Sequence, residues 1–407
     1  MPFKIQQHRV GGRRNQMIES VTTKNTIYAG DLINSCLQLN LPFALYRLPW
    51  QSVFQLIISE NKLENRKKID FEECKPGFVI APFDNQIPYF YEADHILTFE
   101  NNEIPKDLIP DFLKTINKNY DPKEAGFSFV PANEDSNESR EYSKKIEAVI
   151  QRITGGESQK VVISRKKHLG TLQEKNYFKA FKTLSNSYPS AFVSVCNVPW
   201  KNQIWIGASP EILVTQNEKG IFKTVALAGT QSALNNAGEE IRTIDALWSH
   251  KEIEEQALVS RYIINCLKKI RVREYQEYGP KTVKAGNLLH LCSTYSIDSK
   301  EINFSNLSSV MLDLLHPTSA VCGIPKEPSL QIIKEIENYD REFYSGYLGP
   351  VNIQNESHVF VNLRSMKIEN DEIFAFAGGG ITEDSVPEKE WNETEIKLKT
   401  IQKSFDF

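Results

Sequence analysis

The strongest constraint on the fold lies in residues 374–397, where an apolar strand, a run of glycines and a charged helix follow one another. The strand is expected to end in three glycines at 378–380, and a short polar loop follows. Pro387 then starts a helix, at a position where its missing N–H costs nothing. On that helix Glu390, Glu393 and Lys397 occupy positions i, i+3 and i+7 and therefore share one face.

This arrangement suits a divalent cation that lies beside a carboxylate ligand. A hard cation prefers oxygen donors, which the two glutamates supply, and glycine lets a ligand approach free backbone amides in a loop. Taken alone, the charged helix is also compatible with a solvated surface that carries ordinary i, i+4 ion pairs. The adjacent glycines favour the binding site.

Composition argues against several classes of function. The 407-residue chain has a net charge of −4 and no long basic stretch, so nucleic acid is not an expected partner. Its six cysteines show no metal-ligand spacing, which is typical of reduced thiols in a cytoplasmic protein. The sequence has no 18-residue apolar run and no signal-peptide pattern. We therefore expect a protein that neither crosses a membrane nor is exported.

A polar stretch at 131–140 divides the chain. Residues 1–135 alternate a helical segment with short β-like runs and carry no catalytic motif, so we interpret them as the N-terminal half of a sheet scaffold. Residues 140–407 carry the motifs, and the two regions are expected to form one structural unit. Strands joined by hairpins, with helices inserted in blocks, predict an α+β fold with large, mostly antiparallel sheets. Three strands are expected before the closing helix.

Four further residues place charge at strand ends or on helix faces. Lys160 starts an apolar strand, and Glu211 lies in a turn that a proline fixes. Glu255 lies on the longest predicted helix, at about 249–271. Taken singly, these three are compatible with ordinary surface or turn residues. Arg364 lies within an apolar strand, and a buried guanidinium needs an anionic partner.

Together these segments resemble the chorismate-utilising enzymes, which include isochorismate synthase, salicylate synthase and the first components of anthranilate synthase and aminodeoxychorismate synthase. The resemblance implies two stacked antiparallel sheets with helices outside and the active site between the sheets. The matching stretches follow the family's order and are KVVISR (160–165), ASPEIL (208–213), LAGT (227–230), Glu255, LHPTSAVCG (315–323), REFYSG (341–346), LR (363–364) and the tail to Lys397.

The resemblance also implies chorismate as the substrate and Mg²⁺ as a required cofactor. By motif position, the metal-binding residues would be Glu255, Glu390 and Glu393. The substrate-binding positions would be Gly229, Thr230, His290, Ala320, Tyr344, Arg364, Gly378 through its amide, and Lys397. Chorismate carries two carboxylates, which need cations and backbone donors, and Mg²⁺ binds through one or two carboxylates plus substrate oxygens.

The nucleophile separates the branches of this family. Isochorismate synthases add water at C2 and release hydroxide from C4, whereas the anthranilate and aminodeoxychorismate enzymes use nitrogen. Water needs a general base and the leaving hydroxide needs a general acid. Lys160 stands where the water-using branch has lysine, so we predict Lys160 as the base and Glu211 as the acid. A lysine base requires a lowered pKa, to which Arg165 could contribute, and an acidic glutamate requires a raised pKa.

Smaller features also favour an isochorismate synthase, acting in menaquinone or siderophore biosynthesis. Arg341-Glu342 resembles that branch, and no Pro-Ile precedes LAGT. Gln256 departs from the family, which commonly has histidine directly after the ligand glutamate. The alternatives are a salicylate synthase, a nitrogen-using enzyme and a catalytically silent chorismate-binding subunit. A silent subunit would lack a residue of the acid–base or metal set, and none is lacking. We expect a monomer without a glutamine amidotransferase subunit, because ammonia is not needed.

Overall fold

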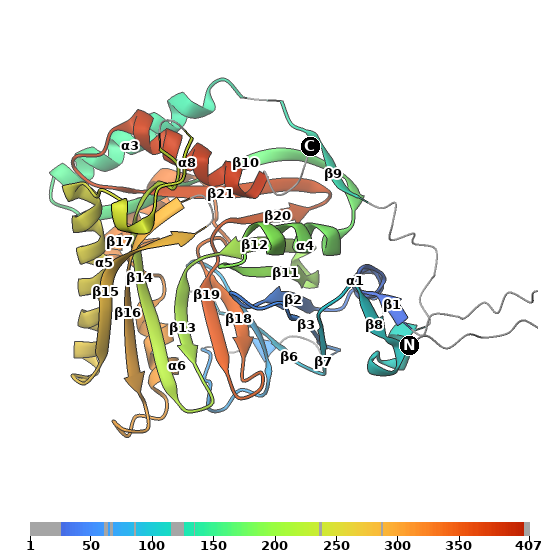
Figure 1. Cartoon of the computed structure of the whole chain (residues 1–407). Coiled ribbons are helices and arrows are strands. Elements are labelled where there is room, and N and C mark those ends of the chain that lie inside the picture. The colour runs from blue at the N-terminus through green and yellow to red at the C-terminus, as the bar shows by residue number, and fades with distance from the viewer. Residues whose placement is uncertain are drawn as a thin grey trace, which may run out of the picture.

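Two large antiparallel sheets form the centre of the molecule (Figure 1). The computed structural model describes residues 26–60, 64–65, 68–84, 87–114, 126–133, 135–235, 238–285 and 288–402. Within these residues one sheet has ten strands and the other has nine, and neighbouring strands run antiparallel throughout. The predicted α+β class with large antiparallel sheets is confirmed.

The ten-stranded sheet has the order β17-β10-β21-β20-β12-β11-β2-β3-β7, and β9 pairs with the far end of β10. Its strands are β2 (Phe43–Arg47), β3 (Phe54–Ile58), β7 (His95–Phe99), β9 (Phe127–Pro131), β10 (Lys160–Lys175), β11 (Phe192–Val198), β12 (Gln203–Ser209), β17 (Gly323–Ile324), β20 (Ser365–Glu369) and β21 (Glu372–Ile381).

The nine-stranded sheet has the order β15-β16-β14-β13-β19-β18-β5-β6-β4. In both sheets, strands from before residue 135 pair with strands from after residue 140, as β2 does with β11 and β5 with β18. The strands are β4 (Glu64–Asn65), β5 (Gly77–Ala81), β6 (Tyr89–Glu92), β13 (Ile212–Gln216), β14 (Ile221–Ser232), β15 (Gln276–Ala285), β16 (Leu288–Asp298), β18 (Tyr347–Val351) and β19 (Ser357–Val361), beside a separate pair of β1 (Thr26–Tyr28) and β8 (Glu103–Pro105).

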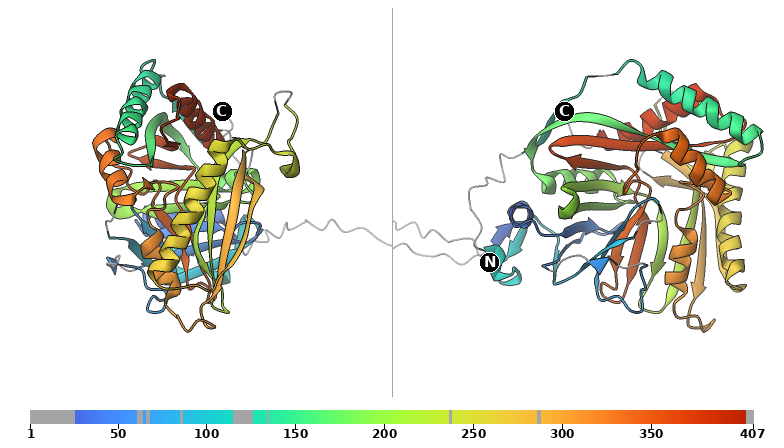
Figure 2. Two further views of the ribbon diagram at one scale, coloured as in Figure 1. Left: turned by 90° about the vertical axis from the view of Figure 1, so that its left-hand side faces the viewer. Right: turned by 180° about the vertical axis from the view of Figure 1, so that it is seen from behind.

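Helices cover the outer faces of the sheets (Figure 2). Helices α3, α7 and α8 pack near β10 and β21, α5 packs against β14 and β16, α6 against β13, and α4 against β11 and β12. No helix in the described ranges is long and apolar enough to cross a membrane. The helices are α1 (Ala29–Gln38), α2 (Asp111–Lys114), α3 (Glu138–Thr154), α4 (Tyr177–Ser187), α5 (His250–Lys269), α6 (Leu307–Leu315), α7 (Lys326–Glu337) and α8 (Pro387–Gln402), with 3-10 turns η1 (Lys106–Leu108), η2 (Pro199–Lys201) and η3 (Thr243–Asp245).

An aromatic layer lies between the two sheets. Phe192 of β11 and Phe360 of β19 stack across the sheets with ring centroids 4.3 Å apart. Within the ten-stranded sheet, Trp205 of β12 stacks on Phe376 of β21 at 5.4 Å. Offset aromatic pairs of this kind stabilise a fold by about 0.5–1.5 kcal/mol beyond the area they bury. Phe376 also forms part of the wall of the cavity described next, so the layer holds that wall rigidly.

Candidate active site

A cavity of about 100 Å³ lies between the sheets, next to α5 and α8. Its walls include residues of β10, β14, β16 and β21 together with these two helices. Two of the predicted site residues, Lys160 and Glu390, do not line the cavity but contact residues near it. The others all line it, and they are Glu211, Gly229, Thr230, Glu255, His290, Ala320, Tyr344, Arg364, Gly378, Glu393 and Lys397.

The glycine run forms one wall. The predicted strand that ends in glycines and leads into a polar loop is confirmed, since β21 ends at Ile381. The expectation that the glycines themselves form a loop was wrong, because they pair with β10 as far as Ile381. Glycine is required here because side chains approach the strand closely. A Cβ atom at Gly380 would lie 2.7 Å from Lys160 Cε and 3.1 Å from Glu255 Oε1. A Cβ atom at Gly379 would lie 3.0 Å from Glu390 Oε2.

The backbone of Gly378 nevertheless faces the cavity. Gly378 lies opposite Ser164 in the ladder, but the Ser164 N–H donates to Glu337 Oε1 at 2.6 Å. The Gly378 carbonyl accepts from Lys397 Nζ at 2.7 Å. Because the two residues do not exchange backbone hydrogen bonds, the N–H and C=O of Gly378 both point away from β10. This is the orientation that the predicted role of its amide requires.

Lys160 is buried and ion-paired. Its side chain is 1% exposed, and its Nζ donates to Glu255 Oε1 at 2.7 Å. Burial pushes the pKa of the Glu255 carboxyl upward, but the surrounding ammonium groups, Lys160 foremost, outweigh burial and hold that pKa below its ordinary value. The pair therefore joins the start of β10 to helix α5 across the end of β21.

The suggestion that Arg165 places positive charge beside Lys160 was wrong. Lys160 and Arg165 are five positions apart on one strand, so their side chains leave opposite faces. The guanidinium of Arg165 donates to Thr394 Oγ1 at 2.8 Å and stacks over the Trp391 ring at 3.8 Å. It thus ties α8 to the outer face of β10 and does not reach the cavity.

Glu211 is the cavity residue whose acidity is shifted most clearly toward neutral pH. Its side chain is only 6% exposed, and burial raises its pKa from 4.5 to about 7, against the lowering effect of nearby cations such as Lys160. The turn predicted for this residue follows β12, and the Glu211 carbonyl accepts from the Val361 N–H at 3.0 Å. That bond fixes the backbone of Glu211 against β19, at the point where the chain passes from one sheet to the other.

His290 presents a neutral imidazole to the cavity. Its Nδ1 lies 3.0 Å from the Gly229 carbonyl and 3.2 Å from Thr230 Oγ1. A carbonyl can only accept, so Nδ1 carries the proton and Nε2 is an acceptor. Burial lowers the pKa of His290 to about 3, and Nε2 is buried without a hydrogen-bond partner among the described residues. Gly229, with a φ of 68°, makes the bulge in β14 that turns its carbonyl toward the ring.

Arg364 and Lys397 make the cavity attractive to anions. Arg364 lines the wall from the connection between β19 and β20, and the prediction that it lies within a strand was wrong. Within the described ranges its guanidinium has no hydrogen-bond or ion-pair partner. Its backbone has a φ of 49°, a conformation that costs non-glycine residues on the order of 1–3 kcal/mol and often marks functional sites. Lys397 Nζ donates to Glu393 Oε1 at 2.6 Å as well as to the Gly378 carbonyl.

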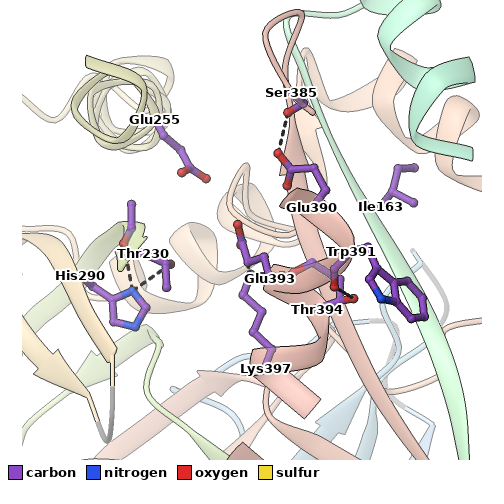
Figure 3. Close-up of polar contacts among 12 residues, drawn as sticks. Ile163, Thr230, Glu255, His290, Ser385, Glu390, Trp391, Glu393, Thr394 and Lys397 are labelled. Atoms are coloured by element: carbon purple, nitrogen blue, oxygen red, sulfur yellow. Dashed lines mark hydrogen bonds and ion pairs between the residues drawn. The ribbon is translucent and has the colours of Figure 1, made fainter. Parts of the chain in front are cut away.

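The three glutamates predicted as metal ligands differ in orientation. Figure 3 shows Glu255 and Glu393 pointing into the same space, while Glu390 points toward Ser385. The Ser385 hydroxyl donates to Glu390 Oε1 at 2.8 Å, and burial raises the pKa of Glu390, with Glu393 adding to the effect. Within the part of the chain that the structure describes, no three acidic, histidine or cysteine side chains are grouped closely enough to hold a metal ion.

The donors nevertheless fit a hard cation. They are carboxylate oxygens, which Mg²⁺ prefers, and Glu390 Oε2 is buried without a hydrogen-bond partner among the described residues. Glu255 and Glu393 face the cavity, as two ligands of one ion would. Direct ligation by Glu390 is not what its observed orientation favours.

Sequence reasoning missed some members of the wall. Arg341 lines the cavity and donates to the Val162 carbonyl at 2.7 Å and to the Val321 carbonyl at 2.8 Å, which ties two wall segments together. Arg341 also belongs to the REFYSG motif and pairs with Glu337 four residues before it, but the two carbonyls that it ties together are distant in sequence, so no local pattern signals its place in the wall. The departure at Gln256 lies outside the site. Its amide donates to the Ala226 carbonyl at 3.2 Å, on the face of α5 that packs against the sheet.

The fold and the cavity define an α+β protein with a buried cavity that is lined by charged side chains. The sequence of residues 96–406 matches the family described as chorismate binding enzyme, and the chain belongs to that family. The vibriobactin-specific isochorismate synthase of Vibrio cholerae is 29% identical over 243 residues, which cover 60% of this chain and 60% of that protein. The isochorismate synthase DhbC of Bacillus subtilis is 27% identical over 271 residues, 65% of this chain and 67% of that protein.

The match to the first of these relatives thus spans less than two thirds of its length. Among solved structures, MenF, the menaquinone-specific isochorismate synthase of Escherichia coli, superposes with a TM-score of 0.72 at 20% identity. That superposition covers 90% of this chain and 89% of the other, and it shows a shared fold.

Proposed function

We propose that this protein is an isochorismate synthase, which converts chorismate to isochorismate for menaquinone or siderophore biosynthesis. The observation that supports this function most directly is Glu211, a buried carboxyl group with a pKa of about 7 in the cavity. A carboxylic acid that is protonated at neutral pH can give its proton to a leaving hydroxide. The names of the two relatives described above agree with this activity.

The cavity can bind a ring that carries two carboxylates and a hydroxyl. Arg364, Lys397 and the Gly378 amide would bind carboxylate oxygens, because they supply charge and backbone donors in a buried place. The Nε2 atom of His290 can only accept, so it would take a hydrogen bond from a substrate hydroxyl. Thr230 and Tyr344 complete this wall.

Glu255 and Glu393 would hold Mg²⁺ through their carboxylate oxygens. The ion would stabilise negative charge on the ring carboxylate as the ring is attacked. Glu255 now accepts from Lys160, and Glu393 from Lys397. Each of these contacts uses only Oε1, so the second oxygen of each carboxylate could bind the cation.

The chemistry needs two proton transfers that balance. Lys160, in its neutral form, takes a proton from water as the water oxygen bonds to C2. The ring double bonds shift, the C4–O bond breaks, and Glu211 gives its proton to the departing oxygen. One water enters and one leaves, so the net reaction is an isomerisation. As the base, Lys160 must first lose its ion pair with Glu255.

The test is to incubate the purified protein with chorismate and Mg²⁺, with and without ammonium, and to separate the products by chromatography. We expect isochorismate in both conditions and none without Mg²⁺. Salicylate with pyruvate would make the protein a salicylate synthase, and an aminated product would place it in the nitrogen-using branch. Binding of chorismate without any turnover would identify a silent binding subunit.

A further inference from the structure

Glu390 is held by two donors on the outer side of β21. Lys251 Nζ donates to its Oε1 at 3.0 Å, and Ser385 Oγ donates to the same oxygen at 2.8 Å. Lys251 lies one turn before Glu255 on α5, so one helix presents both side chains to this region. The other oxygen, Glu390 Oε2, is buried and has no hydrogen-bond partner within the described ranges.

The three glutamates predicted as metal ligands are each paired with one lysine, but the three lysines differ in their position relative to the cavity. Lys397 lines the cavity, and Lys160 contacts Glu255 in its wall. Lys251 lines an outer hollow of about 800 Å³ that adjoins the cavity at Glu255 and Gly380, and its side chain is 42% exposed. A ligand in the cavity would therefore meet Lys397 and leave the Lys251–Glu390 pair intact.

Glu390 is close enough to the metal-binding carboxylates to join them. A Cβ atom at Gly379 would lie 3.0 Å from Glu390 Oε2 and 3.9 Å from Glu393 Oε1, so both carboxylates border the same small volume. A rotation of the Glu390 side chain would bring a third carboxylate to the ion. The contacts from Lys251 and Ser385 oppose that rotation.

We propose that Lys251 is a positioning residue that holds Glu390 away from the metal, which leaves coordination positions for substrate oxygens. This rests on the proposed function, in which Mg²⁺ binds to Glu255 and Glu393. Mg²⁺ accepts six oxygens in near-ideal octahedral geometry, so a third protein carboxylate would occupy a place that the substrate needs. The Lys251 ammonium also repels the cation and limits its affinity in the absence of substrate.

The test is calorimetric titration of Mg²⁺ into the protein without chorismate, for wild type and Lys251→Met. The variant loses both the positive charge and the hold on Glu390, so we expect Mg²⁺ to bind roughly tenfold more tightly, a change of about 1.4 kcal/mol. In turnover assays its KM for chorismate should rise. Lys251→Arg should behave like wild type, because it keeps a donor and a charge.

Two further variants make the result specific. In Lys251→Met/Glu390→Gln the affinity should return toward the wild-type value, because the third carboxylate is gone. Glu254→Gln, at an exposed neighbouring position, should not tighten binding. Unchanged or weaker Mg²⁺ binding in Lys251→Met, with wild type binding normally, would overturn the role of Lys251 alone. Wild-type turnover that does not depend on Mg²⁺ would instead refute the metal requirement of the proposed function, and this inference with it.

Discussion

Single residues in the cavity have protonation states that differ from those in water. Burial leaves Glu211 able to hold a proton near pH 7 and keeps His290 neutral, with a pKa of about 3. One group can therefore donate a proton while the other can only accept a hydrogen bond at Nε2. The sequence predicted both residues through motif position, but their charge states follow from burial, which only the fold reveals.

Glu211→Gln tests the general acid. The variant should lose about 10²–10⁴-fold in kcat, because glutamine has no proton to give to the leaving oxygen. Wild-type activity should fall as the pH rises through about 7, where Glu211 loses its proton, and the variant should lack that decline. The measurement is kcat against pH for both proteins. A decline near pH 7 that persists in the variant would assign this ionisation to another group.

The same substitution has a stability readout with a defined sign. The folded-state pKa of Glu211 is raised, so its contribution to stability is present below pH 4.5 and is lost as the pH rises through about 7. At pH 8 the buried carboxylate destabilises wild type. Glu211→Gln should therefore be the more stable protein at that pH, by about 3 kcal/mol at most.

Among the structural elements, β21 shows how a strand can serve as the wall of a site. Its glycines pair in the ladder like other strand residues, yet their missing side chains make room for Lys160 and for two glutamates. Glycine normally weakens a strand interior, so these residues make β21 less stable than other residues would. They are nevertheless required, because the lysine and glutamate side chains lie too close to the strand for a Cβ atom.

Gly380→Ala should separate this role from folding. The added methyl group meets the flexible end of Lys160, which can move, so the melting temperature should stay within a few degrees of wild type. The methyl group would displace the ammonium of Lys160, the proposed base, and kcat should therefore fall at least tenfold. The control is Gly155→Ala, at the end of α3, where φ is an ordinary −73°. Full activity in Gly380→Ala would show that the space is not required.

Local patterns predicted most elements but not their long-range partners. The starts of α8 at Pro387 and of β10 at Lys160 were confirmed, because a proline and a short apolar run are local signals. The glycine run was misjudged, since only pairing with β10 keeps it extended. Four strands, β18 to β21, precede α8 instead of three. Gly349 and Pro350 inside β18 are residues that usually interrupt a strand.

For the whole molecule, the fold class followed from the sequence, while the strand order and the contacts that assemble the site did not. The α+β class was predicted, and so were half of the residues that line the cavity. The pairs Lys160–Glu255 and Lys251–Glu390 were not, because each joins segments that only the tertiary fold brings together. The division at residues 135–140 stays a prediction, and strands from both sides of it pair in both sheets.

Buried histidines should make the whole protein sensitive to acid. Burial lowers the pKa of His290 and of His316 to about 3, so each contributes stability above pH 6.5 that is lost as the pH falls toward 3. In His316→Gln the amide can replace the hydrogen bond from the ring to the Pro82 carbonyl. As the pH is lowered from 6 to 4, the free energy of unfolding of the variant should rise, relative to wild type, by about 1 kcal/mol per pH unit.

The measurement is urea denaturation of both proteins at pH 7, 6, 5 and 4. His250→Gln, at an exposed position, is the matched control and should show no such trend. A constant difference between His316→Gln and wild type across this range would show that His316 does not couple folding to proton uptake.

The pairing of β10 with β21 also bears on how this molecule comes into being. Val162 lies opposite Gly380, so the strand pair beside Lys160 joins two segments that are far apart in the chain. During synthesis on the ribosome, the segment that contains Lys160 emerges long before its partner and must wait with an unpaired edge. Such non-local pairing slows folding and exposes apolar edges to other chains. The site would therefore form only after β21 has been synthesised. Until then, the incomplete chain is the species that most needs a chaperone.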